Sequence, residues 1–161
     1  MTDTTTLWSY DPGRATGLAE GFYGPETPYT LRDVTVLHDG VEGVSDWYWT
    51  TAPNLGYPKG MHVIENFIVR PGQPADPIAL EVIGFIKGIT HADQRVMRLR
   101  SDKHFVPDAV LKANGLWFTG KQVNHTDGRD ANDAIIHAIS WLAFKMNHRP
   151  TLERYFPDVD H

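Results

Sequence analysis

The sequence contains no cysteine, which excludes disulfide bonds and thiolate metal ligands. Any metal ion must therefore be held by oxygen atoms or by imidazole nitrogen. The sequence also lacks an apolar run near the ~18 residues of a membrane-spanning helix, and it does not open with a basic-then-apolar signal peptide. These absences predict a protein of the reducing cytoplasm with no membrane partner.

Basic residues are outnumbered, with 15 Lys and Arg against 20 Asp and Glu and a net charge of −5. Nucleic-acid binding usually requires a basic surface, so this balance counts mildly against DNA as a partner. Two features weaken that objection. Arg95, Arg98, Arg100 and Lys103 are gathered in one short stretch, and acids pooled at a metal site would be neutralised by cations.

The length of 161 residues and the hydrophobic share of 41% suit one α/β domain spanning 1–161. Its core is expected at about 5–146, followed by a C-terminal tail at about 147–161. Strands are predicted at 5–10, 17–23, 29–38, 62–69 and 95–99. Helices are predicted at 44–51, 78–89, 107–113 and 130–146. This order indicates a five-stranded mixed sheet, with three antiparallel strands followed by two parallel strands and helices on both faces.

Two acids stand where strands are predicted. Asp11 opens the turn Asp11-Pro12-Gly13, and turn formation alone explains an aspartate at that position. Glu65 lies inside the apolar run 63–69, where a buried carboxylate costs several kcal/mol unless it is paired or bound to metal. An edge position or a strand-end ion pair is the structural alternative for Glu65.

Asp130 and Asp133 open the last predicted helix. Helix capping explains one of them well, because an aspartate at the N-terminus accepts hydrogen bonds from free N–H groups. At positions i and i+3 both side chains share a face and can point toward one centre. Together with Asp11 and Glu65 they form a set of four carboxylates that suits two Mg²⁺ or Mn²⁺ ions able to cleave a phosphodiester.

Three segments resemble the RuvC family of Holliday junction resolvases, which have the RNase H-like fold. Residues 10–19 (YDPGRATGLA) resemble the family's first-strand motif, and residues 63–66 (VIEN) its fourth-strand glutamate. Residues 130–139 (DANDAIIHAI) resemble its closing helix with paired acids. The resemblance extends from about residue 5 to about residue 146, and the acidic charge suggests a divergent, phage-type member.

The resemblance implies a homodimer that binds a four-way DNA junction and nicks two strands using Mg²⁺ or Mn²⁺. Asp11, Glu65, Asp130 and Asp133 would be the metal ligands, and Lys103 is the favoured catalytic lysine. His125 or Asp127 could replace Asp130 as a ligand. The residues expected to contact DNA are Arg14, Phe67, Arg70, Arg98, Arg100, Lys103, Lys112 and Lys121.

The chain departs from the family after Glu65, where an aromatic wedge is expected. Phe67 follows two residues later and Ile68 three residues later, which leaves the wedge in doubt. The helix at 78–89 carries more apolar residues than one sheet-facing stripe needs. It is therefore a candidate dimer surface, although burial within its own domain explains the same pattern.

Three other functions stay open from the sequence. A nuclease with the same chemistry could trim flaps or other branches, because branch geometry depends on dimer shape. An actin-like nucleotide binder normally needs a second similar domain, for which 161 residues leave no room. A non-catalytic DNA-binding protein would not be expected to retain all four acids.

Overall fold

Five strands form the central sheet of the computed structural model, which describes residues 3–158. In chain order they are β1 (Thr5–Asp11), β2 (Thr16–Gly24), β3 (Thr27–Leu37), β4 (Met61–Asn66) and β5 (Arg95–Leu99). Their spatial order is β3-β2-β1-β4-β5. The strands β1, β2 and β3 pair antiparallel, whereas β4 is parallel to β1 and β5 is parallel to β4. The predicted mixed sheet is confirmed.

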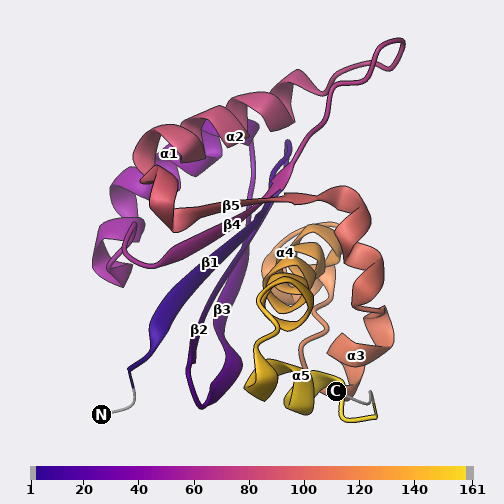
Figure 1. The fold of residues 1–161 in the computed structure, drawn as a ribbon. Helices are drawn as coiled ribbons and strands as arrows, with labels where there is room; N and C mark the ends of the chain where they lie inside the picture. Colours follow the sequence, from indigo (N-terminus) through magenta and orange to yellow (C-terminus); the bar gives the residue numbers. More distant parts are fainter. Residues whose placement is uncertain (1–2, 159–161) are drawn as a thin grey trace.

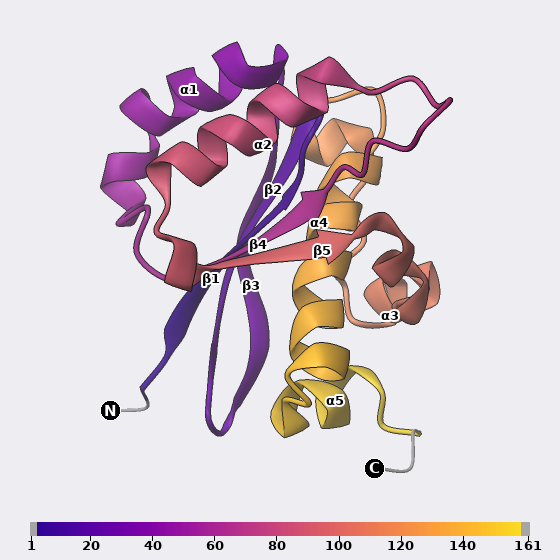
Figure 2. The ribbon, with the colours of Figure 1, turned by 45° about the horizontal axis from the view of Figure 1, so that its top comes forward.

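Helices cover both faces of this sheet (Figures 1 and 2). On one face lie α1 (Gly40–Thr50) and α2 (Pro77–Ile89); on the other lie α4 (Arg129–Ser140), α5 (Arg149–Tyr155) and, beside α4, α3 (Asp108–Ala113). Short 3-10 turns occur at η1 (Ala52–Leu55), η2 (Ala92–Gln94), η3 (Arg100–Phe105) and η4 (Gly120–Val123), and α4 continues as a π-helical turn, η5 (Trp141–Lys145). Within residues 3–158, no helix combines the length and apolar character needed to cross a membrane.

Alternation along the central strands decides which side chains reach which face. On β1, Leu7 packs in the core beneath α4 and α5, whereas Trp8 and Tyr10 pack beneath α1 and α2. Because successive strand residues point to opposite faces, Asp11 falls on the α4 face with Leu7. The same rule on β4 sends Val63 and Glu65 toward α4.

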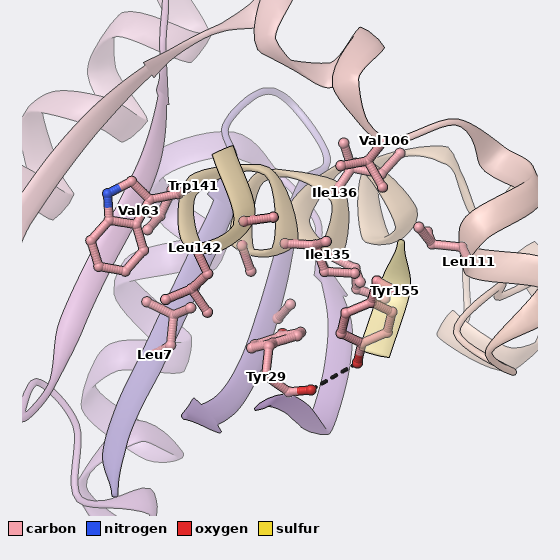
Figure 3. Packing of buried hydrophobic residues seen from close by; sticks show 14 of the residues in the cluster. Leu7, Tyr29, Val63, Val106, Leu111, Ile135, Ile136, Trp141, Leu142 and Tyr155 are labelled. Carbon is pink, nitrogen blue, oxygen red and sulfur yellow. Dashed lines mark hydrogen bonds between the residues drawn. The ribbon is translucent and has the colours of Figure 1, made fainter. Parts of the chain in front are cut away.

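The core on the α4 face joins the two ends of the chain. Figure 3 shows Leu142 of η5 beside Leu7 of β1, in the same buried cluster as Ile135 of α4 and Trp141 of η5. Tyr155 of α5 donates a hydrogen bond from Oη to the carbonyl of Tyr29 at 2.8 Å, and the Tyr29 N–H donates to Thr151 Oγ1 at 2.9 Å. These contacts fasten α5 to β3.

Three boundaries predicted from sequence are wrong. The strand expected to run to residue 69 ends at Asn66, because the following residues leave the sheet in a loop before α2. The last helix does not stay α-helical to Met146, since it widens into the π turn after Ser140. The expected tail contains α5, whose Leu152, Tyr155 and Phe156 are buried. Residues 159–161 of that expected tail lie outside the described residues.

Candidate metal centre

Asp11, Glu65 and Asp133 come together at the carboxyl ends of two parallel strands. Tyr10 of β1 pairs with Ile64 of β4, so Asp11 and Glu65 follow on neighbouring strands, and both face α4. Asp11 is 9% exposed and Glu65 8%, which makes both carboxylates nearly buried. The carboxyl edge of such strands is where open α/β sheets usually carry their sites.

Lys103 of η3 lies among these three acids. Its Nζ is 2.7 Å from Asp133 Oδ2, 2.9 Å from Glu65 Oε2 and 3.8 Å from Asp11 Oδ1. The expected convergence of the three carboxyl groups is therefore found. We call Asp11, Glu65, Lys103 and Asp133 the acidic cluster.

Gly17 lets the start of α4 approach the sheet closely enough to complete this cluster. It is paired with Asp11 across the β1–β2 hairpin. A Cβ atom added at Gly17 would lie 1.9 Å from the carbonyl oxygen of Asp130. No side chain fits in that space, so the glycine of the first-strand motif is needed for packing against α4.

A second contact holds α4 from the other side. The buried side chain of Asn132 accepts a hydrogen bond from the Phe118 N–H at 2.9 Å and donates one to the Phe118 carbonyl at 3.0 Å. A Cβ atom at Gly128 would lie 1.9 Å from the same carbonyl oxygen. The first turn of α4 is therefore fixed between β2 and the loop that precedes it.

The segment that carries Lys103 is also anchored. Asp102 Oδ2 accepts a hydrogen bond from the Leu99 N–H at 2.9 Å and lies 3.3 Å from an Arg98 guanidinium nitrogen. Ser140 Oγ of α4 donates to the Asp102 carbonyl at 3.2 Å. These bonds tie η3 to both β5 and α4 and so place Lys103 over the acids.

The surroundings of Asp11 and Glu65 shift the pKa values of these two acids in opposite directions. Burial raises the pKa of Asp11 to about 8; Lys103 opposes this shift, whereas the charges of Glu65 and Asp133 add to it. Burial alone would also raise the pKa of Glu65, but hydrogen bonds from His137 and Lys103 outweigh it and lower the pKa to about 2. Burial would lower the pKa of Lys103, but the surrounding carboxylates raise it.

His137 is a site residue that the sequence interpretation missed. It is fully buried in α4, and its Nε2 lies 2.7 Å from Glu65 Oε2. Within residues 3–158, Asp11, Glu65 and His137 form the group whose potential ligand atoms all lie within 4.8 Å of one another. The available signal was its spacing, because His137 is four residues beyond Asp133 and shares its helix face.

Asp130 lies toward the edge of the cluster. Its Oδ2 is 3.7 Å from His125 Nε2, and the ring of His125 is 5.0 Å from that of His38. Burial raises the pKa of Asp130, and the charges of Asp127 and Asp133 add to this effect. Asp127 Oδ1 accepts a hydrogen bond from the Arg129 N–H. Asp130 is therefore close enough to act on the charge of Asp11, but among residues 3–158 neither Asp130 nor Asp127 forms an ion pair with Lys103.

The side chains expected to contact DNA are not equally accessible. Exposed side chains belong to Arg14, Arg70, Arg100, Lys112 and Lys121. The side chain of Arg98 is only 10% exposed and is directed to Asp102, so it offers little surface to DNA. Lys112 lies over the ring of Trp117, with Nζ 4.4 Å from the centroid.

The loop between β4 and α2 projects from the body of the protein in both views (Figures 1 and 2). Phe67, at its base, is partly buried against the core beneath α1 and α2. Ile68 and Val69 are 49% and 54% exposed. The exposed apolar side chains after Glu65 are therefore aliphatic, and the aromatic one packs on the domain itself.

A cleft of about 520 Å³ opens beside the acidic cluster. It is bordered by the loop before α4 and by the first turns of that helix, and Asp133 lies in its wall. Trp117 and Arg129 contribute an aromatic ring and a positive charge to the same wall. The cleft therefore meets the acidic cluster at Asp133.

No protein-family model and no curated protein sequence matches the chain. Solved structures do resemble it. Thermus thermophilus RuvC in complex with a Holliday junction substrate has a TM-score of 0.54 at 12% identity, covering 90% of this chain and 97% of that one. A second T. thermophilus RuvC structure has a TM-score of 0.54 at 15% identity, covering 89% and 97%.

The fowlpox virus Holliday junction resolvase also resembles the chain, with a TM-score of 0.53 at 15% identity over 85% of this chain and 97% of that one. The T. thermophilus RuvC and the viral resolvase are thus matched over nearly their full lengths. The chain has the RuvC-like fold of the Holliday junction resolvases, in a divergent sequence.

Proposed function

We propose that the protein is a divalent-metal-dependent endonuclease that cuts branched DNA, with four-way junctions as its substrate. The observation that carries this proposal is the acidic cluster, in which Asp11, Glu65 and Asp133 from three elements lie within 4.0 Å of one ammonium group. The resolvases that share the fold support the choice of branched DNA.

The donor set fits Mg²⁺ or Mn²⁺. These ions take oxygen ligands, and carboxylates supply them here. The pKa of Asp11 is raised by burial and by neighbouring acids, so its ionised form lacks a sufficient positive counter-charge. Asp11, Glu65 and Asp133 would hold one ion, and Asp130 would complete the site for a second. When bound, such ions activate water and stabilise the leaving oxygen of a phosphodiester.

Lys103 and the rigid placement of the carboxylates would supply the other contributions to cleavage. Lys103 carries its proton at Nζ and offsets part of the negative charge of the carboxylates, which otherwise repel a phosphate. From the same position it can donate a hydrogen bond to a phosphate oxygen entering beside Asp133. The buried strands and α4 fix the carboxylates in place before the substrate arrives, which reduces the reorganisation required for cleavage.

Five exposed basic residues would contact the DNA backbone: Arg14, Arg70, Arg100, Lys112 and Lys121. Cutting two strands symmetrically requires two sites related by a two-fold axis, so the proposal includes a homodimer. The candidate surface is α2, where Leu80, Gly84 and Gly88 are exposed. The loop 67–76 would reach toward the junction's branch point.

The test compares a labelled four-way junction with a flap and a plain duplex. We expect paired nicks in the junction with Mg²⁺ or Mn²⁺ and no cleavage in excess chelator. Ca²⁺ is expected to support binding better than cutting, because its looser coordination positions water poorly. Cleavage that persists in chelator would exclude the metal mechanism.

Light scattering with and without junction DNA measures the assembly. A dimer in either condition, nicking both strands in one binding event, is the expected result. A monomer in both conditions that nicks one strand would exclude junction resolution and leave a nuclease acting on flaps or other branches.

A further inference from the structure

We propose that His137 is a positioning residue that holds Glu65 by donating a hydrogen bond, and that it is not itself a metal ligand. The inference rests on the proposed metal-dependent function, and it assigns a role to a residue outside the set of four acids. It starts from the hydrogen bond between His137 Nε2 and Glu65 Oε2, at 2.7 Å.

Glu65 receives both of its donors on the same oxygen. His137 Nε2 and Lys103 Nζ lie 2.7 and 2.9 Å from Oε2. No other hydrogen bond or ion pair of the Glu65 carboxylate is found among residues 3–158. Oε1 is therefore the oxygen available for a further ligand, while Oε2 is held by the protein.

The environment of the second ring nitrogen indicates which form of His137 is present. His137 Nδ1 is buried and has no hydrogen-bond partner among residues 3–158. A buried N–H without an acceptor costs about 1–3 kcal/mol, whereas an unpaired lone pair is tolerated more often. The ring is therefore in the tautomer with its proton on Nε2, which it donates to Glu65.

A nitrogen that donates its proton to a carboxylate has no lone pair left for a metal ion. His137 Nδ1 keeps a lone pair, but the two ring nitrogens point in diverging directions, and Nε2 is the one directed at Glu65. The closeness of His137 to Asp11 and Glu65 therefore reflects support of the carboxylate. This arrangement resembles the second layer of hydrogen bonds that orients ligands in metal sites.

The two donors to Glu65 differ in how firmly they are held. Lys103 has a long side chain on a 3-10 turn and divides its charge among three acids, so any cation entering the cluster competes with it. His137 has a short side chain, is 0% exposed and lies in the last turn of α4, where the helix continues into η5. When an entering cation displaces Lys103 from Glu65, the hydrogen bond from His137 keeps the Glu65 carboxylate in its orientation.

The first experiment measures Mn²⁺ binding to the DNA-free protein by electron paramagnetic resonance. His137→Leu keeps the size and removes the donor, whereas His137→Gln places an amide N–H near the position of Nε2. We expect His137→Leu to weaken Mn²⁺ binding by about 10–100-fold, as supporting residues at metal sites do, and His137→Gln to restore most of the loss.

His62→Leu is the matched control, because His62 is also fully buried but lies on the other face of the sheet. We expect it to lower the melting temperature and to leave the Mn²⁺ affinity of the folded protein unchanged. When the concentration of junction DNA is varied, His137→Leu is expected to lower kcat and to leave KM for DNA unchanged, because His137 does not reach the surface.

Undiminished Mn²⁺ affinity in folded His137→Leu would overturn the positioning role. A His137→Gln variant as weak as His137→Leu would also overturn it, since an imidazole ligand would then be required. Wild-type protein that binds no Mn²⁺ would overturn the proposed function, and this inference with it.

A second measurement needs no variant. Nitrogen-15 NMR of the imidazole side chains distinguishes the two tautomers directly in wild-type protein. The proton of His137 is expected on Nε2 both without metal and with saturating Mg²⁺. A proton that moves to Nδ1 when Mg²⁺ is added would show that Nε2 has become a ligand, and would overturn the inference.

Discussion

Polar side chains are buried on both faces of the sheet, but their partners differ. Beneath α1 and α2, Tyr10 Oη lies 2.9 Å from Tyr57 Oη and 3.0 Å from His62 Nδ1, and His62 Nε2 donates to the Pro58 carbonyl at 2.8 Å. We call these groups the tyrosine–histidine network. Its members are neutral, and both nitrogens of His62 have partners.

On the α4 face, the acidic cluster brings three carboxylates around one ammonium group. Its charges are only partly balanced, and the pKa of Asp11 is raised as a result of burial and of the neighbouring acids. A closed network of neutral hydrogen bonds stabilises the fold. An unbalanced cluster instead lowers stability until a cation binds, which is the pattern expected of a functional site.

Asp11→Asn is expected to reduce junction cleavage by about a thousandfold. A bound metal ion would lower the activation barrier by several kcal/mol, and each 1.4 kcal/mol of barrier is tenfold in rate. Junction binding should be retained, since loss of an anion reduces repulsion of phosphate. Cleavage and filter-binding assays on one junction measure both effects. Tyr57→Phe, in the tyrosine–histidine network, is the control and should cut at the wild-type rate. Wild-type turnover by Asp11→Asn would remove Asp11 from the site.

Gly17→Ala is expected to destabilise the protein by about 1–3 kcal/mol, in the range of an overpacked core. The added Cβ would meet the carbonyl of Asp130, so the first turn of α4 must move away from β2. Cleavage should fall together with stability, because Asp133 moves with that turn. Gly84→Ala is the matched control, since a Cβ there meets open space. Chemical denaturation that finds the Gly17 and Gly84 variants equally stable would refute the close-packing explanation.

Tyr10→Phe is expected to lower the free energy of unfolding by about 1–3 kcal/mol, because it leaves His62 Nδ1 and Tyr57 Oη without a buried partner. The adjacent Asp11 keeps its contacts on the other face, so the cleavage rate of the folded protein should not change. Thermal unfolding and an activity assay well below the melting temperature separate the two effects. A large loss of cleavage with unchanged stability would show that the two faces are coupled.

The two regions should respond to pH in opposite directions. Burial raises the pKa of Asp11 to about 8, so the metal-free folded protein binds the proton more tightly than the unfolded chain, and stability falls as pH rises from about 4 to 8. Burial lowers the pKa of His62 to about 4. The contribution of the neutral His62 ring to stability is therefore fully present above pH 6.5 and is lost as pH falls toward 4.

Between pH 6.5 and 8, Asp11 is the one of these two groups whose protonation still changes. The melting temperature of metal-free protein should therefore decline by a few degrees across this range, and the decline should be absent in Asp11→Asn. Saturating Mg²⁺ should also remove it, because a bound cation favours the ionised carboxylate. An equal decline in wild-type and Asp11→Asn proteins would assign the slope to another group.

Periodicity and turn residues were sufficient to predict the five strands, the helices α1 to α4 and their order. The hairpin strands, the central strand, α2 and β5 follow from apolar alternation and from Gly and Pro positions. Glu65 was also identifiable, because a carboxylate inside an apolar strand needs a partner. These inferences depend on local pattern, which a single sequence carries.

Other features depended on contacts between distant segments. The boundary at Asn66 and helix α5 were missed because short elements are stabilised by what they pack against, as Tyr155 is by Tyr29. Arg98 was expected to face DNA, but Asp102 holds most of its side chain inside the protein. Neither outcome is visible in local composition.

The sequence by itself determined which side chains are available: four acids at strand and helix ends, lysines after β5 and a glycine beside Asp11. Only the tertiary structure decided how they combine, because alternation on β1 and β4 turns Asp11 and Glu65 to one face while the approach of α4 at Gly17 brings Asp133 and His137 to meet them. Those distances depend on segments more than fifty residues apart, and close packing between them is a property of the folded chain.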